Sequence, residues 1–438
     1  MSEKTPILPT NFRNHLKGET LFPRDRILLV LSILLQGAIA LFFGHAYDMR
    51  IFMATGYLVG TGQNPYVAQN LVAVFQNSTF QGITSFGYPP PWALILGVIY
   101  LVTFRIIPNF LLYNLAIKIP LIIANIGMAF LVRHILVKLS VQESISRQAW
   151  VFLLFNPFLL LTTSAWGQFD SIVALLSLLS LYLLSQGKLT VPAILLALAI
   201  AFKPVALPLA PVVFVFLSGR SLKQKLQYYS VFSTSLLLFI VAPFMILGWE
   251  PTVILQHWNA HFTVGGGLSF MTFLENLNHS YQLIGGWWWV GWLWVPALVF
   301  ATYALRPGIT GTLDLFKKSL ALILVFYLCR AWLSEPNVNL ILPLVLILVS
   351  TGELKPFTLV AVWVLPLVFS FFNTSIAQLF FPRLPAVMEY LLKLAVEFNP
   401  VRFFLRTLVV IAWLVSGWWI VINCYKTGRL QKEGKLSI

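Results

Sequence analysis

Residues 155–204 read FNPFLLLTTSAWGQFDSIVALLSLLSLYLLSQGKLTVPAILLALAIAFKP, two long apolar runs interrupted by two short polar motifs. The first motif is WGQFDS (166–171) and the second is AFKP (201–204). Apolar runs of this kind predict membrane-embedded helices, where charge is expensive and is retained mainly for function. Asp170 and Lys203, the charged residues of the two motifs, are therefore candidates for functional side chains.

The whole chain has the same character. Of its 438 residues, 59% are hydrophobic and only 10% are charged, which is far from the composition of soluble domains. Several continuous apolar runs approach or exceed the roughly 20 residues that a helix needs to cross a bilayer. Because these runs do not alternate apolar with polar residues, we expect an all-α polytopic membrane helix bundle. The first run follows about 26 polar residues without a cleavage site, which favours a retained span over a signal peptide.

The positions of the basic residues predict how the chain is oriented in the membrane. The net charge of +15 therefore indicates which loops lie in the cytoplasm and does not indicate nucleic-acid binding. Five of them precede the first span, which places the N-terminus in the cytoplasm. With alternation from there, 20 of the 29 basic residues fall inside. The resulting spans are 27–43, 110–132, 149–164, 171–186, 190–203, 205–218, 227–247, 284–304, 318–333, 337–351, 356–372 and 405–424.

This topology predicts one integral membrane domain over 1–438, with about 12–13 transmembrane helices and membrane-embedded helices on the outer face. Residues 1–26 and 425–438 form cytoplasmic tails, and 44–109 and 248–283 form outer loops. The apolar run 92–104 is too short to span and is expected to be a half-embedded outer helix. Cys329 and Cys424 fall on opposite sides, so no disulfide is expected.

Most unusual polar groups gather at the outer face in this topology. His45 and Asp48 lie in the first outer loop, and the turns 166–171 and 334–337 open to the same side. The expectation is a composite site there, with Glu335 contributed by the second turn. The plain alternative is that outer loops are polar simply because they are exposed.

A series of motifs resembles a known family. Asp48 follows the first span, and GQNPY (62–66) and YPPP (88–91) come next. PN (108–109), Lys118, RHIL (133–136), FNP (155–157), WGQFDS and AFKP follow in order. This order resembles the membrane glycosyltransferases of the GT-C fold, especially the GPI mannosyltransferases and their bacterial relatives, over roughly residues 27–220.

The resemblance implies a transferase that moves a sugar, usually mannose, from a polyprenyl- or dolichyl-phosphate carrier to a hydroxyl of a glycan or glycolipid acceptor at the extracytoplasmic face. It also implies an acidic motif in the first outer loop, often Asp-x-Asp, which in some members acts with a divalent metal. Asp48 matches the second acidic position, but Ala46 occupies the first. A lone carboxylate is a poor site for a hard cation, so no metal ligand and no certain cofactor is assigned.

The chemistry agrees with this assignment on general grounds. A lipid-phosphate leaving group needs cations rather than a proton, whereas the hydroxyl nucleophile needs a base. We expect Asp48 to be that base in a single inverting displacement, because the phosphate removes the need for the second, acidic carboxyl of an inverting glycosidase. The alternative is that Asp48 caps the following helix.

The remaining site candidates are expected to hold substrate. Lys203 is positioned to bind the carrier phosphate, with snorkelling as the alternative. Arg330, within span 318–333, offers a two-pronged phosphate ligand. Gln168 and Asp170, beside Trp166, form a turn suited to sugar hydroxyls and stacking. Asp170 as a helix cap paired with Lys203 is the alternative.

His257 and His261 stand four residues apart in the second outer loop. Because no Glu lies between them and no third ligand is placed, zinc is disfavoured, and one histidine is expected to bind phosphate or assist proton transfer. The glycines 265–267 that follow predict a segment able to close over substrate, with an ordinary flexible loop as the alternative.

Two rival functions remain open from the sequence. Twelve helices with both ends inside also suit a transporter or a lipid-linked-sugar flippase. A catalytically silent GT-C relative is the third reading, since Ala46 lacks acidity. The expected location is the bacterial inner (plasma) membrane with the site facing outside, or the endoplasmic reticulum membrane in a eukaryote.

Overall fold

The computed structural model describes residues 23–67, 69–83, 86–252, 255–256, 264–272, 285–305 and 308–426. Helices make up nearly all regular structure in this part of the chain, and the one sheet there has two short parallel strands, β1 (Gly266–Gly267) and β2 (Trp332–Leu333). The predicted all-α polytopic helix bundle is confirmed.

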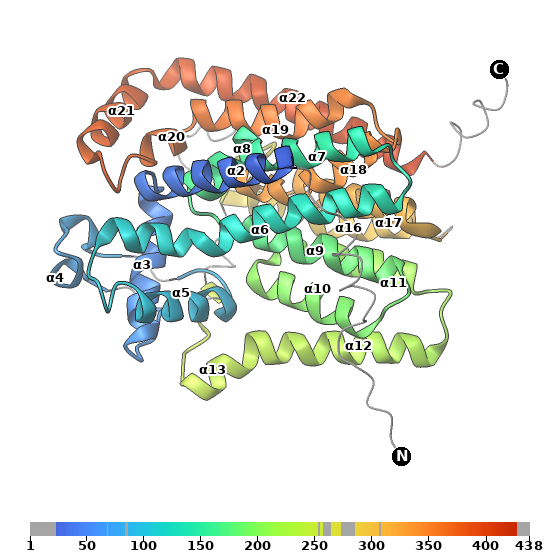
Figure 1. The fold of residues 1–438 in the computed structure, drawn as a ribbon, viewed down its shortest axis with the longest axis horizontal. Coiled ribbons are helices and arrows are strands. Elements are labelled where there is room, and N and C mark those ends of the chain that lie inside the picture. The colour runs from blue at the N-terminus through green and yellow to red at the C-terminus, as the bar shows by residue number, and fades with distance from the viewer. Residues whose placement is uncertain are drawn as a thin grey trace.

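The long helices run along the long axis of the bundle, and one helix crosses them at an end (Figure 1). The crossing helix is α3 (Ala46–Gly60), and α4 (Val72–Phe75) lies at the same end. We call this end of the bundle the α3 end. The first half contains α2 (Pro23–Phe42), α5 (Pro90–Val102), α6 (Phe110–Lys138), α7 (Glu143–Phe155), α8 (Pro157–Leu159), η2 (Leu160–Ala165), α9 (Asp170–Ser185), α10 (Thr190–Phe202) and α11 (Leu209–Phe216).

The second half completes the bundle. Its elements are α12 (Leu222–Leu236), η4 (Leu237–Val241), α13 (Ala242–Leu247), η5 (Gly285–Trp292), α16 (Trp294–Tyr303), α17 (Gly311–Leu328), η6 (Glu335–Leu340), α18 (Leu342–Ser350), α19 (Pro356–Phe372), α20 (Ser375–Gln378), α21 (Pro385–Glu397) and α22 (Asn399–Tyr425). Two short turns, η1 (Ser78–Phe80) and η3 (Pro204–Ala206), belong to the first half. α13 and α21 lie at the α3 end (Figure 1).

Each of the twelve predicted spans overlaps a helix. Five helical segments among the described residues are long and apolar enough to cross a membrane: Pro23–Phe42, Phe110–Lys138, Glu143–Ala165, Leu222–Leu247 and Asn399–Tyr425. The others are shorter: α5, the predicted half-embedded outer helix, has 13 residues, and α10, a predicted span, has the same length. The number of crossings stays a prediction.

The structure adds a helix to one predicted segment and shortens one predicted span. The predicted outer segment 44–109 contains α3, which was not expected, besides α5 near the expected helix 92–104; both helices pack apolar side chains such as Phe52 and Trp92 into the bundle. Span 318–333 also ends early, since α17 stops at Leu328 and leaves Arg330 beyond the helix. The second outer loop, 248–283, lies largely outside the described residues.

The chain turns sharply between α7 and α9, and the local sequence explains why. Asn156 caps a new helical turn by accepting a hydrogen bond from the Leu159 amide (3.0 Å), and Pro157 provides a first-turn residue that needs no donor. The helix then widens into the π-helical η2, a form common near functional sites. Gly167 follows with φ of +96°, where a Cβ would approach Met49 Sδ to 2.4 Å. Only glycine fits this close turn.

Lys118 joins three segments at the α3 end. Its ammonium, fully buried, donates to the carbonyls of Ala40 (3.3 Å), Phe43 and Ala165 (3.1 Å). Asn114, one turn earlier on α6, donates to the Ala40 (2.7 Å) and Phe43 (2.9 Å) carbonyls. The orphan carbonyls at the end of a helix need such partners. α6 therefore fixes the end of α2 against the turn that follows η2.

The opposite end of α2 is held by ion pairs. Asp25 is fully buried, and its carboxylate contacts Arg147 (2.6 Å) and Arg133 (3.5 Å). Arg133 also pairs with Glu143 at 2.6 Å. A buried carboxylate persists when it is paired in this way. α2 is thus anchored to α6 at both ends and to α7 at its first turn.

Replacing Lys118 with methionine, which has a similar length and no charge, should lower stability. The change leaves buried carbonyls short of a donor, at a cost of about 1–3 kcal/mol. Thermal unfolding in detergent measures the effect. Lys188→Met is the matched control because Lys188 is exposed, so a change of less than about 0.5 kcal/mol is expected. Equal melting temperatures for the two variants would contradict the capping role of Lys118.

Candidate functional site

Asp48 lies in the first turn of α3, close behind the end of α2. The residue at the N-cap of α3 is His45, whose side chain makes no capping hydrogen bond. The alternative that Asp48 caps this helix is therefore wrong. A carboxylate in a first helical turn is still stabilised by the helix dipole. Asp48 is thereby placed, buried, at the α3 end.

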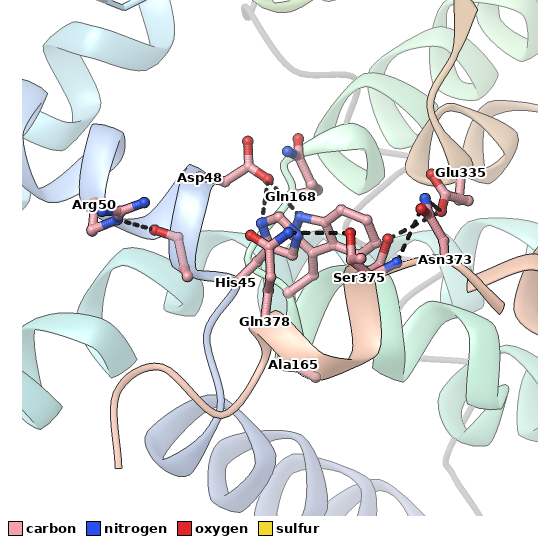
Figure 2. Close-up of polar contacts among 12 residues, drawn as sticks. His45, Asp48, Arg50, Ala165, Gln168, Glu335, Asn373, Ser375 and Gln378 are labelled. Carbon is pink, nitrogen blue, oxygen red and sulfur yellow. Dashed lines mark hydrogen bonds and ion pairs between the residues drawn. The ribbon is translucent and has the colours of Figure 1, made fainter. Parts of the chain in front are cut away.

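One oxygen of Asp48 receives two contacts. The indole Nε1 of Trp166 donates to Asp48 Oδ2 at 2.6 Å, and His45 Nδ1 lies 3.1 Å from the same oxygen (Figure 2). The imidazole of His45 stacks on the indole of Trp166, with ring centres 4.3 Å apart and planes 12° apart. The turn after η2 and the start of α3 therefore meet at the Asp48 carboxylate.

These contacts determine the charge of Asp48. Burial by itself would raise the pKa of the carboxyl. The His45 contact and the hydrogen bonds from Trp166 and Gln168 lower the pKa by more than burial raises it. The pKa of Asp48 therefore lies below its ordinary value of 3.8. Asp48 is therefore a carboxylate at neutral pH. The pKa of Tyr88 is raised well above its ordinary value by burial and by the charges of Asp48 and Asp170, so Tyr88 stays a neutral phenol.

Asp170 and Lys203 form a second charged pair nearby. Lys203 Nζ lies 2.8 Å from Asp170 Oδ2 and 3.4 Å from Gln168 Oε1, and both charged side chains are buried. The ammonium also lies 5.3 Å from the ring centres of Tyr88 and Phe169. Asp170 begins α9 and Lys203 follows α10, so the pair joins the WGQFDS and AFKP motifs. The salt bridge expected as the alternative for these residues is present.

Glu335 begins η6 and is also buried. Its Oε1 accepts hydrogen bonds from Asn373 Nδ2 (3.0 Å) and Ser375 Oγ (3.2 Å), as Figure 2 shows. Ser375 begins α20, and Leu379, directly after this helix, packs against Trp166. Glu335 is thereby attached to the same region as Asp48.

Arg330 is the remaining described candidate. Its guanidinium lies 4.8 Å from the centre of the Phe326 ring, and the side chain is half-buried. None of the ion pairs formed within the described ranges includes it. Arg330 therefore differs from Lys203, whose charge is opposed by a carboxylate.

The glycine segment after the second outer loop differs from expectation. Gly266 and Gly267 pair with Trp332 and Leu333, and a Cβ on Gly267 would meet the Leu333 carbonyl oxygen at 2.1 Å. The glycines permit this close backbone approach, which ties the segment down instead of freeing it to close over a substrate. His257 and His261 lie outside the described residues.

Sequence reasoning missed several residues of this region. It noted charge inside membrane segments only at Asp170, Lys203 and Arg330, although Lys118 interrupts the apolar run 111–132. That isolated charge was the available signal for the capping role. The pairing of Glu335 with Asn373 and Ser375 had no sequence signal, because 38 and 40 residues separate the partners. Within the described part of the chain, no group of three His, Cys, Asp or Glu side chains is placed to hold a metal ion.

Comparison with known proteins gives one family match over part of the chain. Residues 115–264 match the model of the ALG6, ALG8 glycosyltransferase family. The match covers about a third of the chain, including both polar motifs of 155–204, but not Asp48. No curated protein matches the chain.

The protein is thus a membrane glycosyltransferase of the GT-C class, a class that takes sugars from lipid-linked donors. The predicted class and the predicted enzyme activity are confirmed. The mannosyl subfamily is not, because the matching model is that of the ALG6, ALG8 family.

Removing either partner of the Asp170–Lys203 pair should destabilise the protein by about 3–5 kcal/mol, because the other charge is left buried and unpaired. The double variant Asp170→Asn/Lys203→Met should lose less than the sum of the single variants. Thermal unfolding of the two single variants and the double variant in detergent gives the coupling free energy between the two side chains.

Lys317 and Glu353 provide the matched control pair. Lys317 Nζ lies 2.7 Å from Glu353 Oε2, and both side chains are partly exposed. A partly exposed pair should show a coupling of no more than about 1 kcal/mol. Additive losses at Asp170 and Lys203 would contradict the buried pairing.

Proposed function

We propose that the protein transfers a hexose from a polyprenyl- or dolichyl-phosphate carrier to a hydroxyl of a glycan or glycolipid acceptor, with inversion and with Asp48 as the general base. The observation that supports this most is the buried carboxylate of Asp48, kept ionised by Trp166, His45 and Gln168. An ionised carboxylate with a fixed position suits proton removal from an incoming hydroxyl.

The reaction balances with the groups that are present. The acceptor oxygen attacks the anomeric carbon, the bond from that carbon to the phosphate oxygen breaks, and the lipid phosphate leaves with the electron pair. Asp48 takes the acceptor's proton. Since the leaving phosphate is stable as an anion, the site needs no acid opposite Asp48, but it does need a cation.

Arg330 is the described residue best suited to that cation role. Lys203 was expected to share it, but its ammonium is 2.8 Å from Asp170, so its charge is largely neutralised. Arg330 forms no ion pair with a described residue, and a guanidinium binds two phosphate oxygens at once. We therefore assign the carrier phosphate to Arg330 and a structural share of the site to Lys203.

Sugar and acceptor hydroxyls are assigned to the polar side chains around Asp48. Asp170 Oδ1 is buried and has no hydrogen-bond partner within the described part of the chain, so it is available to accept from a hydroxyl. Gln168 lies between the two aspartates through its contacts with Lys203 and Asp48. Glu335, His257 and His261 complete the proposed set, with the two histidines outside the described residues.

The proposed face is extracytoplasmic. The basic residues place both chain ends in the cytoplasm, so that Asp48, after the first span, falls outside. The membrane is then a bacterial plasma membrane, or that of the endoplasmic reticulum in a eukaryote. The resemblance favours mannose as the sugar, whereas the family match makes glucose the necessary second donor to test.

Asp48→Asn should abolish transfer while leaving the fold intact, because an amide of the same shape cannot accept the proton. Purified protein in lipid vesicles is incubated with polyprenyl-phosphate mannose or glucose and an acceptor extract, and released polyprenyl phosphate is quantified. A loss of about 10²–10⁴-fold is expected for removal of a general base.

Asp314→Asn is the matched control, since Asp314 lies in the first turn of α17, away from the site. Full transfer by Asp48→Asn would reject Asp48 as the base. Release from neither donor by the wild type, together with substrate counterflow in vesicles, would favour a transporter.

The pH dependence of kcat/KM follows from the charge of Asp48. A carboxyl whose pKa is lowered stays ionised as the pH falls. Asp48 should therefore cause no loss of kcat/KM between pH 8 and about 5. Loss of kcat/KM should begin only near or below the ordinary pKa of 3.8. Initial rates at low substrate concentration measure this. An acid limb centred near pH 6 that disappears in Asp48→Asn would contradict an ionised Asp48.

A further inference from the structure

His45 occupies an unusual place for a histidine. It is the N-cap of α3, but its side chain caps nothing, and its backbone amide donates to the Trp166 carbonyl at 3.2 Å. This bond fixes the imidazole over the indole of Trp166, where the two rings stack. His45 is buried, with 6% of its surface exposed. His45 is therefore held in position by contacts unrelated to helix capping.

The imidazole of His45 touches the carboxylate of Asp48 through Nδ1. Asp48 Oδ2 lies 3.1 Å from this nitrogen. Nδ1 is buried and makes no hydrogen bond within the described part of the chain, so the contact is an electrostatic one. Trp166 Nε1, which is a donor only, approaches the same Oδ2 at 2.6 Å. One hydrogen bond and one ion-pair contact thus meet at the same carboxylate oxygen, Oδ2. The other oxygen, Oδ1, is assigned to the acceptor's proton.

We propose that His45 is a positioning residue that acts through Asp48: together with Trp166 it fixes Oδ2 and orients Oδ1 toward the acceptor hydroxyl. This inference rests on the proposed function, in which Asp48 is the base. His45 does not touch the reacting atoms.

Other charged groups near Asp48 are already committed to different partners. Lys203 pairs with Asp170, and Lys118 donates to three backbone carbonyls. Among the described residues, the ion pair that includes Asp48 is the one with His45. Besides His45, the described ionisable groups that interact with the charge of Asp48 are Tyr88 and Asp170. His45 is thus the ionisable side chain in direct contact with the Asp48 carboxyl among the described residues.

Two substitutions separate the roles of the ring. His45→Phe keeps an aromatic face for Trp166 but has no N–H group. His45→Asn places an amide N–H close to the former Nδ1 and does not titrate. In His45→Phe we expect kcat to fall about 10- to 100-fold, as for loss of an orienting partner, with KM nearly unchanged.

The acid limb of kcat/KM should also move to higher pH in His45→Phe, because the contact that lowers the pKa of Asp48 more than any other is lost. His45→Asn should recover most of kcat and move the acid limb less. A purely structural role would not produce this ordered pair of effects.

Transfer rates in vesicles and thermal unfolding are measured for the wild type, both variants and His134→Phe. His134, on α6, is the control because its Nε2 contacts the hydroxyl of Tyr182 on α9 (3.2 Å), apart from the site. Unchanged kcat and acid limb in folded His45→Phe would overturn the proposal, as would failure of folded His45→Asn to recover kcat.

The outcomes also separate this inference from the proposed function. Loss of transfer in Asp48→Asn with normal transfer in His45→Phe rejects only the role of His45. Full transfer in Asp48→Asn rejects Asp48 as the base, whatever the His45 variants do.

Discussion

The ammonium of Lys118 is the contact on which the geometry of the α3 end depends. It lies inside the bundle and binds carbonyls from the end of α2, from the residue that follows it and from the end of η2. A buried cation of this kind is tolerated only where acceptors surround it. Since α3 starts just after α2 and Trp166 follows η2, one side chain of α6 fixes the relative position of Asp48 and Trp166.

Around this anchor, the site contains two carboxylates whose partners differ. Asp48 accepts a hydrogen bond from Trp166 and contacts the imidazole of His45, whereas Asp170 is opposed by the full charge of Lys203. In surroundings of low dielectric constant, such partners determine which groups remain charged. A carboxylate held by hydrogen-bond donors keeps one oxygen free to act, while one paired with lysine contributes mainly to the frame. This difference is the physical basis for giving the two aspartates different roles.

Much of the fold followed from the sequence, because the hydrophobic effect acts on continuous runs and helix length is set by bilayer thickness. Each predicted span overlaps a helix. The sequence did not predict α3, because this helix, with Asp48 and Arg50 in its first turns, lacks a long apolar run. Arg330 was placed inside a span because the apolar run continues to Leu333, whereas the helix itself ends at Leu328.

The sequence by itself determined the helical class, the ordered polar motifs and the identity of the candidate groups, since each depends on neighbours along the chain. Only the tertiary structure decided which partners these groups have. Asp48 meets Trp166 across 118 residues, and Lys118 meets Phe43 across 75. Contacts over such separations depend on how helices pack against one another. Packing is set by the shapes and polar partners of many side chains at once, and no local pattern in the chain encodes it.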